Sequence, residues 1–373
     1  MAPIDPLTGI EAARVTAYIH FPFCLSKCPY CDFASIASKQ PPNERYTRAL
    51  LAELKMRGAP RLDAVYFGGG TPSLWPAQHV SEVLDSLDLA DGAEVTLEAN
   101  PGAADAARFR DYRAAGINRL SIGVQSFEPS TLKALGREHD GAMAEAAFKA
   151  ARAAGFDNVS LDFIYGVHGQ TPEQAVSDAR RAASLEPEHL SAYALTLEKE
   201  ALAEEVPLAK QLSRGEVQLP PDDVVVAMQR AVAEAYAAKG LIRYEVSNYA
   251  KAGYHSRHNA AYWTGGEYVA LGAGATGRVG HVRYQNHRSA EKYFADVEAG
   301  RLPEASREEL DDETLAAERV AMGLRLTAGV KLDHAPPAKL ERLEREGLIV
   351  RGERVRLTER GFDLHSSIAA ALM

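Results

Sequence analysis

Apolar and polar positions divide the first half of the chain into a repeated pattern of strands and helices. Short apolar runs predict β-strands over residues 15–21, 64–67, 94–98, 119–124, 158–165 and 190–197. Amphipathic stretches between them predict helices over residues 44–57, 77–88, 103–115, 142–154 and 173–184. A strand followed by a helix, repeated about every 30 residues, is typical of a parallel sheet with right-handed crossovers. The strands read as nearly continuous apolar runs, which is expected when both faces of a sheet are covered.

Two α/β architectures fit this pattern, a doubly wound open sheet and a (β/α) barrel. In both, ligands bind at the carboxyl ends of the parallel strands. Polar and glycine residues follow the predicted strands at these ends: Gly68, Gly69, Gly70, Thr71, Glu98, Asn100, Gln125 and Asp162. We therefore expect a ligand-binding site along this edge of the sheet.

The pattern changes after residue 200, and we expect three parts: residues 1–200, 201–310 and 311–373. Residues 201–223 are charged, contain proline and lack apolar periodicity, so they predict a long excursion or lid. The rest of the middle part predicts a helix over 224–239, a strand over 241–249 and a segment rich in aromatic, His and Gly residues over 254–283. The last part predicts helices over 314–324 and 338–346, a short hairpin over 347–358 and a helix over 359–372. Helix, hairpin and helix in this order predict a winged-helix-like α+β module.

Composition limits the classes of function. The 373 residues carry a net charge of −9, which argues against a nucleic-acid-binding protein that relies on a basic surface. Residues 1–16 lack the basic and apolar pattern of a signal peptide, and no apolar run approaches the ~18 residues of a membrane span. We expect a cytoplasmic protein without a transmembrane segment, and peripheral membrane contact stays open.

The chain contains only three cysteines, Cys24, Cys28 and Cys31, spaced as C-x₃-C-x₂-C. Three buried apolar cysteines would not cluster in this way, and a disulfide would leave one thiol over. Structural zinc needs a fourth ligand, for which His20 is the candidate. Iron–sulfur clusters are held by thiolates from such loops, and Pro29 helps to keep this loop out of a helix. Three thiolates on a four-iron cluster would leave one iron open to a small molecule.

The segment from Tyr18 to Phe33, YIHFPFCLSKCPYCDF, resembles the signature of radical S-adenosylmethionine (SAM) proteins. Within that superfamily it resembles the branch of oxygen-independent coproporphyrinogen III oxidase and its relatives. The resemblance implies a [4Fe–4S] cluster on Cys24, Cys28 and Cys31, with SAM at the fourth iron. It also implies a partial (β/α)₆ TIM-like barrel, which the six predicted strands favour over the doubly wound sheet.

The resemblance also implies residues that contact SAM. The turn containing Gly69, Gly70 and Thr71 matches the turn that meets the SAM amino group, although glycine clusters are commonly ordinary turns. Glu98, Gln125 and Asp162 match contacts to the amino acid and ribose groups, although each could also cap a helix. Arg137 matches an arginine near the SAM carboxylate, and a solvated surface residue is its alternative. Three residues, Tyr18, Tyr30 and Thr196, match further positions around the cofactor. Tyr18 could instead be an aromatic residue of the core.

A second informative segment is His258-Asn-Ala-Ala-Tyr-Trp, residues 258–263. A lone His is commonly structural, and Tyr and Trp can simply pack against a sheet. The segment nevertheless resembles the H-N-x-x-Y-W motif of the haem chaperones of this branch, in which the His is associated with haem. The resemblance implies haem as a ligand, His258 as its contact and an acceptor protein as a partner. His255, His281 and His287 are unranked alternatives.

The residue that separates the two relatives is Phe33. The oxidases of this branch carry a fourth cysteine two residues after the third, and here that position is Phe33. We therefore expect a haem chaperone that binds haem, a [4Fe–4S] cluster and SAM and delivers haem to an acceptor. The alternatives are coproporphyrinogen III oxidative decarboxylation in porphyrin synthesis, another radical SAM reaction, or a metal-dependent regulator that uses the winged helix. Acidic residues interleaved with the arginines of that module argue against DNA binding.

Overall fold

The computed structural model describes residues 15–103, 105–197, 206–332 and 337–372. Its centre is a run of six parallel strands that pair side by side in chain order. They are β1 (Val15–Phe21), β4 (Leu62–Gly69), β5 (Leu89–Ala99), β6 (Arg119–Gln125), β7 (Val159–Tyr165) and β8 (His189–Ala194). These strands confirm the six predicted strands. The sheet curves without closing, because its strand order begins at β14 and ends at β9, so the barrel is partial.

Later parts of the chain extend the sheet on both sides. Next to β1 lies the parallel β11 (Glu267–Leu271). Beyond it the antiparallel strands are β12 (Thr276–Val279), β13 (Val282–Asn286) and β14 (Glu304–Glu309). Next to β8 lie the antiparallel β10 (Asn248–Ala250) and β9 (Ile242–Arg243).

The single strand predicted over residues 241–249 is wrong, because a tight turn separates β9 from β10. Within this turn the Tyr244 N–H donates to the Asn248 carbonyl, and the Glu245 carboxylate accepts the Ser247 N–H at 2.7 Å. The turn has no glycine or proline, so Ser247 and Asn248 are its only turn-favouring residues and the apolar run hid it.

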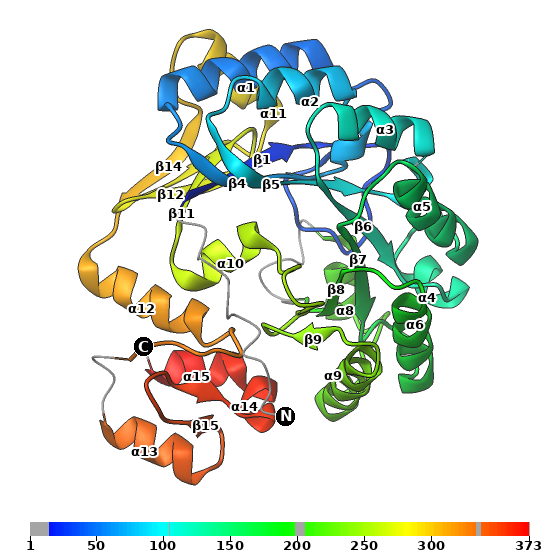
Figure 1. The fold of residues 1–373 in the computed structure, drawn as a ribbon, viewed down its shortest axis with the longest axis vertical. Coiled ribbons are helices and arrows are strands. Elements are labelled where there is room, and N and C mark those ends of the chain that lie inside the picture. The colour runs from blue at the N-terminus through cyan, green and yellow to red at the C-terminus, as the bar shows by residue number, and fades with distance from the viewer. Residues whose placement is uncertain (1–14, 104, 198–205, 333–336, 373) are drawn as a thin grey trace.

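Helices cover the outer side of the curved sheet, whereas α10 (Arg257–Thr264) lies on its inner side against β1 and β4 (Figure 1). The outer helices are α1 (Asn43–Arg57), α2 (Ala77–Leu84), α3 (Ala106–Ala114), α5 (Gly141–Ala153) and α6 (Pro172–Ser184). Several begin at a side-chain cap, such as the Thr171 and Gln174 capping box that opens α6. The sequence did not predict α4 (Pro129–Ala134), α10 or α11 (Ala290–Glu298).

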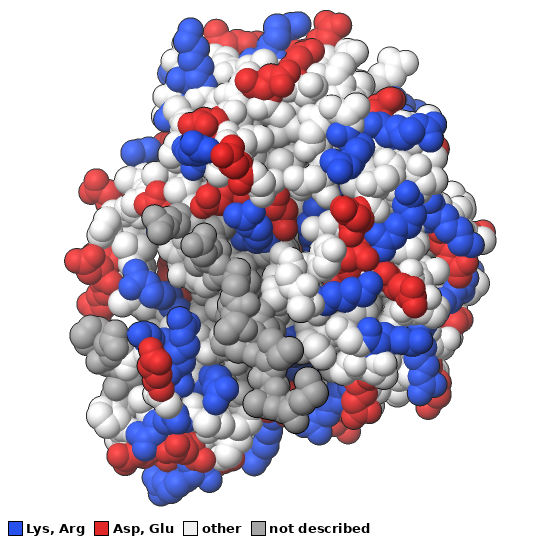
Figure 2. Space-filling model, in the orientation of Figure 1, with Lys and Arg blue, Asp and Glu red and all other residues white. Residues whose placement is uncertain are grey.

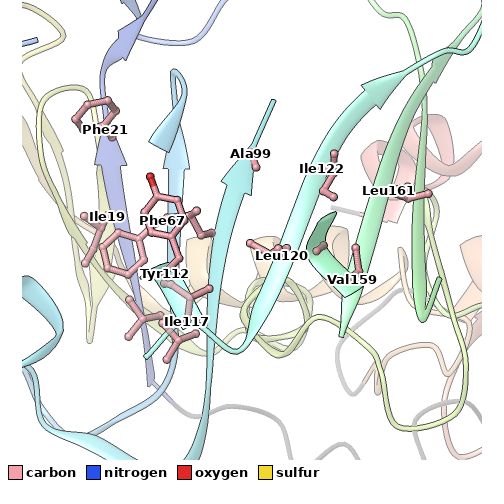
Figure 3. Close-up of a cluster of buried hydrophobic side chains, with 14 of the residues drawn as sticks. Ile19, Phe21, Phe67, Ala99, Tyr112, Ile117, Leu120, Ile122, Val159 and Leu161 are labelled. Atoms are coloured by element: carbon pink, nitrogen blue, oxygen red, sulfur yellow. The ribbon is translucent and has the colours of Figure 1, made fainter. Parts of the chain in front are cut away.

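The two faces of the parallel strands differ in polarity, which corrects the prediction of continuous apolar runs. On the outer face, Ile19, Phe67, Leu120 and Leu161 belong to one buried apolar cluster (Figure 3). The alternate positions on the inner face carry polar side chains: Thr16, His20, Glu94, Thr96, Glu98, Arg119, Ser121, Ser160, Asp162, His189 and Ser191. Successive side chains of a strand point to opposite faces, so this alternation creates an apolar layer under the helices and a polar barrel interior.

The segment predicted as a lid contains α8 (Pro207–Ser213), while residues 201–205 lie outside the described residues. The Leu208 N–H at the start of α8 donates to the carbonyl of Pro29 at 2.8 Å. The excursion therefore returns to the loop that carries the cysteines. It continues into α9 (Asp222–Ala237), which packs against α6.

The C-terminal elements pack around an apolar cluster of their own. They are α12 (Asp312–Gly323), α13 (Pro337–Arg345), β15 (Ile349–Val350), β16 (Arg356–Leu357), α14 (Glu359–Asp363) and α15 (His365–Leu372). The last helix, predicted as one, breaks at Leu364, whose backbone leaves the helical region with φ −114° and ψ 18°. The division into three domains stays a prediction, and the sheet itself runs through the first two parts.

The surface carries charges of both signs. On the face shown in Figure 2, Lys and Arg side chains are interspersed with Asp and Glu side chains. Within the described residues, no helix is both long enough and apolar enough to cross a membrane.

Candidate functional site

The three cysteines lie on one loop at the carboxyl edge of the parallel strands. Cys24 is buried in the short strand β2 (Phe23–Cys24), which pairs with β3 (Ile36–Ala37), and Cys28 and Cys31 lie half-buried in between. Burial raises the pKa of the Cys24 and Cys31 thiols. The hydroxyl of Thr71 donates to Cys24 Sγ at 3.6 Å, and the guanidinium of Arg137 donates to Cys28 Sγ at 3.5 Å. Such donors favour the thiolate form that metal binding requires.

The glycine turn that follows β4 packs directly against this loop. The N–H groups of Gly70 and Thr71 donate to the carbonyls of Phe21 and Phe23. A Cβ atom added at Gly70 would lie 2.9 Å from Cys24 Sγ and 2.7 Å from the Phe23 carbonyl oxygen. Gly69 has a φ of +117°, which residues with a side chain rarely adopt. Glycine is therefore required at Gly70 by the close approach of the cysteine loop, and at Gly69 by its backbone conformation and by the closeness of His20 and Phe21 in β1.

The geometry argues against the zinc alternative. Both ring nitrogens of His20 already have partners, since Nδ1 lies 3.0 Å from the Tyr18 hydroxyl and Nε2 lies 2.9 Å from the Ala34 carbonyl. Burial lowers the pKa of His20 to about 4. Among the described residues, no three His, Cys, Asp or Glu side chains are grouped closely enough to hold a single metal ion. Thiolates that bind different irons of one cluster do not need such a tight grouping.

Arg137 reaches the cysteine loop, so it is not the solvated surface residue that was its alternative. Its Nη2 donates to Asn100 Oδ1 at 2.6 Å and to the Gly123 carbonyl at 3.0 Å. Asn100 in turn donates through Nδ2 to the Thr71 hydroxyl at 3.0 Å. Cys24, Thr71, Asn100, Arg137 and Cys28 thus form one continuous chain of contacts from four separate segments.

Two buried carboxyl groups lie deeper on the inner face of the sheet. Glu98 accepts the Gly69 N–H at 3.2 Å and the Tyr66 hydroxyl at 2.9 Å. Burial raises the pKa of Glu98 to about 7, and the nearby Asp162 carboxyl adds to the shift. Burial also raises the pKa of Asp162, which accepts the Ser121 hydroxyl at 2.8 Å. A positive charge placed beside Glu98 would favour its ionised form and lower this pKa.

The remaining residues predicted around SAM occupy different places. Gln125 ends β6 with a left-handed φ of 65°, and its amide lies over Gly123. Tyr30 is half-buried within the cysteine loop, and burial raises its pKa. Tyr18 lies on the inner face of β1, so it is not part of the outer apolar core. Thr196 is exposed beyond β8, where its hydroxyl donates to the Ala194 carbonyl at 3.3 Å.

His258 lies inside the partial barrel, on the first turn of α10. Its imidazole is 2% exposed and stacks on the rings of Tyr66 and Tyr18, with centroids 5.0 and 6.1 Å apart. Burial lowers the pKa of His258 to about 3. Its Nδ1 is buried without a hydrogen-bond partner among the described residues. The imidazole is therefore neutral and out of contact with solvent.

The three alternative histidines do not gather around His258. The imidazole of His255 is buried against the ring of Tyr244, with the two ring centroids 4.6 Å apart. His281 lies near the surface, where Nδ1 is 2.9 Å from the Leu310 carbonyl, and His287 pairs with Asp296 at 3.2 Å.

Two further residues organise the site. Asn100, which the sequence placed only among the polar residues at the strand ends, joins the glycine turn to Arg137. Sequence reasoning missed the second residue. Glu94, on the inner face of β5, accepts the N–H groups of Arg257 at 2.9 Å and His258 at 3.3 Å. A carboxylate at these N–H groups caps the first turn of α10. No local pattern could have revealed a cap that comes from a strand more than 160 positions away.

Comparison with known proteins places this site in a family. The pattern of the radical SAM superfamily matches residues 18–182. The haem chaperone HemW of Mycobacterium tuberculosis is 37% identical over an alignment that covers 100% of this chain and 98% of that protein. HemW of Bacillus subtilis is 34% identical over 96% of this chain and 99% of that protein.

A solved structure supports the same fold. Coproporphyrinogen III oxidase (HemN) from Escherichia coli, a radical SAM enzyme, superposes with a TM-score of 0.81 over 98% of this chain and 92% of that one. Its sequence identity of 20% establishes only that the two folds are alike. The identity to HemW proteins extends instead over the whole length of the chain. The chain therefore belongs to the HemW family of the radical SAM superfamily.

Proposed function

We propose that this protein is a haem chaperone, which binds haem and delivers it to an acceptor protein. The observation that carries the proposal is the 37% identity to a haem chaperone across the full length of both chains. Phe33 supports it. This residue stands on the cysteine loop where the oxidases carry a fourth cysteine, so the chain has no thiol at that position.

In this proposal Cys24, Cys28 and Cys31 hold a [4Fe–4S] cluster. The donor set fits, because three free thiols share one loop and two of them accept hydrogen bonds from Thr71 and Arg137. Gly70 fits as well, since the absence of a side chain leaves room beside Cys24. The positive charge of Arg137 offsets part of the negative charge of the thiolates.

The residues at the carboxyl edge of the strands would hold SAM beside the cluster. Glu98 and the turn of Gly69, Gly70 and Thr71 would receive its amino group, and Arg137 would pair with its carboxylate. Asp162 and Gln125 would contact the ribose, and Tyr18, Tyr30 and Thr196 would complete the surroundings. When bound, the cluster supplies one electron to the SAM sulfonium, and the residues of this chain bind, orient and shield the cofactor.

His258 is the haem contact proposed from the H-N-x-x-Y-W motif. Because its imidazole is 2% exposed, a haem iron reaches it only when α10 moves away from β1 and β4. The proposed haem contact therefore requires a movement of α10, whereas the proposed cluster site does not, because the cysteine loop is accessible without it.

Two assays on the reconstituted protein test the proposed function. Titration with haemin should produce a saturable Soret band, and anaerobic incubation with coproporphyrinogen III and a reductant should yield no oxidised product. A triple variant, Cys24→Ala with Cys28→Ala and Cys31→Ala, should lose its iron and keep haemin binding, because the two sites use different residues. Turnover of coproporphyrinogen III without haemin binding would replace the chaperone assignment with the oxidase.

A further inference from the structure

The last residues of β6 leave the regular pairing of the parallel sheet. Ile122 pairs with Leu161 of β7, and Gln125 pairs with Phe163. Two residues of β6 therefore lie opposite a single residue of β7, which is Asp162. Such a β-bulge bends the strand and re-aims a side chain, and bulges are common next to ligand sites. This bulge lies at the carboxyl edge of the strands, where the cysteine loop also lies.

Gln125 occupies a strained turn at the end of the bulge. Its φ is 65°, and across it the Ser126 N–H donates to the Val124 carbonyl at 2.8 Å. A hydrogen bond between residues two apart, with a positive φ at the central residue, defines the rare form of the γ-turn. A residue with a side chain keeps such a backbone only when its surroundings hold it there. The contacts that hold this turn are therefore informative.

A buried carboxylate from the outer layer of helices holds the chain after Gln125. Asp178, on α6, is 4% exposed. Its Oδ1 accepts the Phe127 N–H at 2.8 Å, and its Oδ2 accepts the Ser126 hydroxyl. The Ser126 Oγ in turn accepts the Glu128 N–H at 3.0 Å. Both oxygens of Asp178 thus bind the two residues that directly follow the strained one.

The chain before Gln125 is held as firmly. The His139 Nε2 donates to the Val124 carbonyl at 2.8 Å, and Arg137 donates to the Gly123 carbonyl at 3.0 Å. Burial lowers the pKa of His139 to about 4, so this donor is a neutral imidazole. The backbone on both sides of Gln125 is therefore fixed, and its side-chain direction is fixed with it.

We infer that Asp178 is a positioning residue for SAM, which acts by holding the γ-turn that presents the Gln125 amide to the ribose. The inference rests on the proposed SAM site, in which Gln125 and Asp162 contact the ribose. The methionyl part of SAM would be held by other segments, namely the glycine turn, Glu98 and Arg137. Asp178 therefore determines the affinity for the adenosyl part and leaves the affinity for the methionyl part unchanged.

Binding of two probes to the reconstituted full chain tests this inference. The probes are radiolabelled SAM and radiolabelled L-methionine, which has no ribose, in anaerobic equilibrium dialysis. Asp178→Ala should weaken SAM binding about threefold to tenfold, as expected for one misplaced hydrogen bond, with L-methionine binding unchanged. Asp178→Asn should restore most of the affinity, because an amide can accept the Phe127 N–H and donate to the Ser126 hydroxyl. The control Asp311→Ala removes a carboxylate that accepts the Thr314 N–H at 2.8 Å on α12, and it should change neither affinity.

A double variant separates positioning from support of the fold. If Asp178 acts through Gln125, Asp178→Ala should have no further effect on SAM binding in the Gln125→Ala background. If Asp178→Ala does not fold, Ser126→Ala replaces it, because it removes only the hydroxyl that Asp178 binds. Equal weakening of SAM and L-methionine, or an effect that persists in the Gln125→Ala background, would overturn the inference.

The outcomes also separate the inference from the proposed function. If the wild type binds SAM and Asp178→Ala binds it equally well, Asp178 has no positioning role and the proposed SAM site stands. If the wild type binds no SAM, the proposed SAM site fails, and the role of Asp178 fails with it.

Discussion

The cysteine loop and the α10 helix lie against the same two strands, β1 and β4, yet the sheet holds them differently. The loop lies at the rim, where Cys28 and Cys31 are half-buried and the sulfurs have few protein partners. The helix lies inside the barrel, with His258 stacked on tyrosines and its N-terminus capped by Glu94 and Ser256. The loop thus leaves two of its three cysteines partly exposed, whereas the helix is packed inside the barrel.

The two regions are nevertheless joined by direct contacts. Glu98 binds the Gly69 N–H on the cluster side and the Tyr66 hydroxyl on the other, and the Tyr66 ring stacks on His258. A change at one region can therefore be tested for its effect on the other, and the next three predictions do so.

The largest expected effect is loss of the cluster in Gly70→Ala. The new Cβ would lie 2.9 Å from Cys24 Sγ and 2.7 Å from the Phe23 carbonyl, so the loop must shift. We expect iron and sulfide content after anaerobic reconstitution to fall severalfold, with haemin binding unchanged. The matched control is Gly102→Ala, where the nearest atom would be 3.8 Å away. Equal iron content in the two variants would contradict the tight packing of the turn.

A smaller effect is expected on the α10 side in Glu94→Gln. The neutral amide weakens the cap on α10 and leaves the buried Arg119 without one of its neighbouring charges. We expect a loss of about 2–3 kcal/mol in the free energy of unfolding, with the iron content retained. Urea denaturation followed by Trp fluorescence measures it, with the exposed Glu234→Gln as control. A loss of iron equal to that in Gly70→Ala would show that the regions are not separable.

The smallest effect concerns Glu98, which touches both regions. Its folded pKa of about 7 lies above the ordinary value of 4.5, so the unfolded chain loses this proton first as the pH rises. The contribution of Glu98 to stability is thus fully present below pH 4.5 and is lost as the pH rises through 7. Relative to wild type, Glu98→Gln should gain on the order of 1–2 kcal/mol between pH 4.5 and 7.5 in protein free of SAM. A stability difference that does not change with pH would remove Glu98 from this role.

The sequence predicted the cluster side far better than the α10 side. The three cysteines, the glycine turn and the six strands are local patterns, and each element is complete within a few residues. The alternation of residues that creates the polar inner face is present in the sequence, as in Val15-Thr-Ala-Tyr-Ile-His-Phe21. It was interpreted as a continuous apolar run because both faces are buried and most residues of the strand are apolar. The cap on α10 depends on the contact of Glu94 with the Arg257 N–H, which no local pattern encodes.

The pairing of β1 with β11 also sets an order of assembly. Val15 pairs with Glu267, so at ribosomal rates of about 5–20 residues per second the second neighbour of β1 emerges roughly 12–50 s after it. The cysteine loop, the glycine turn, Glu98, Arg137 and Asp162 all lie in the first 165 residues. β11, which pairs with β1, and α10, which lies inside the barrel, both follow residue 256. During synthesis the carboxyl edge of the six parallel strands is thus made well before the elements that complete the sheet beside β1.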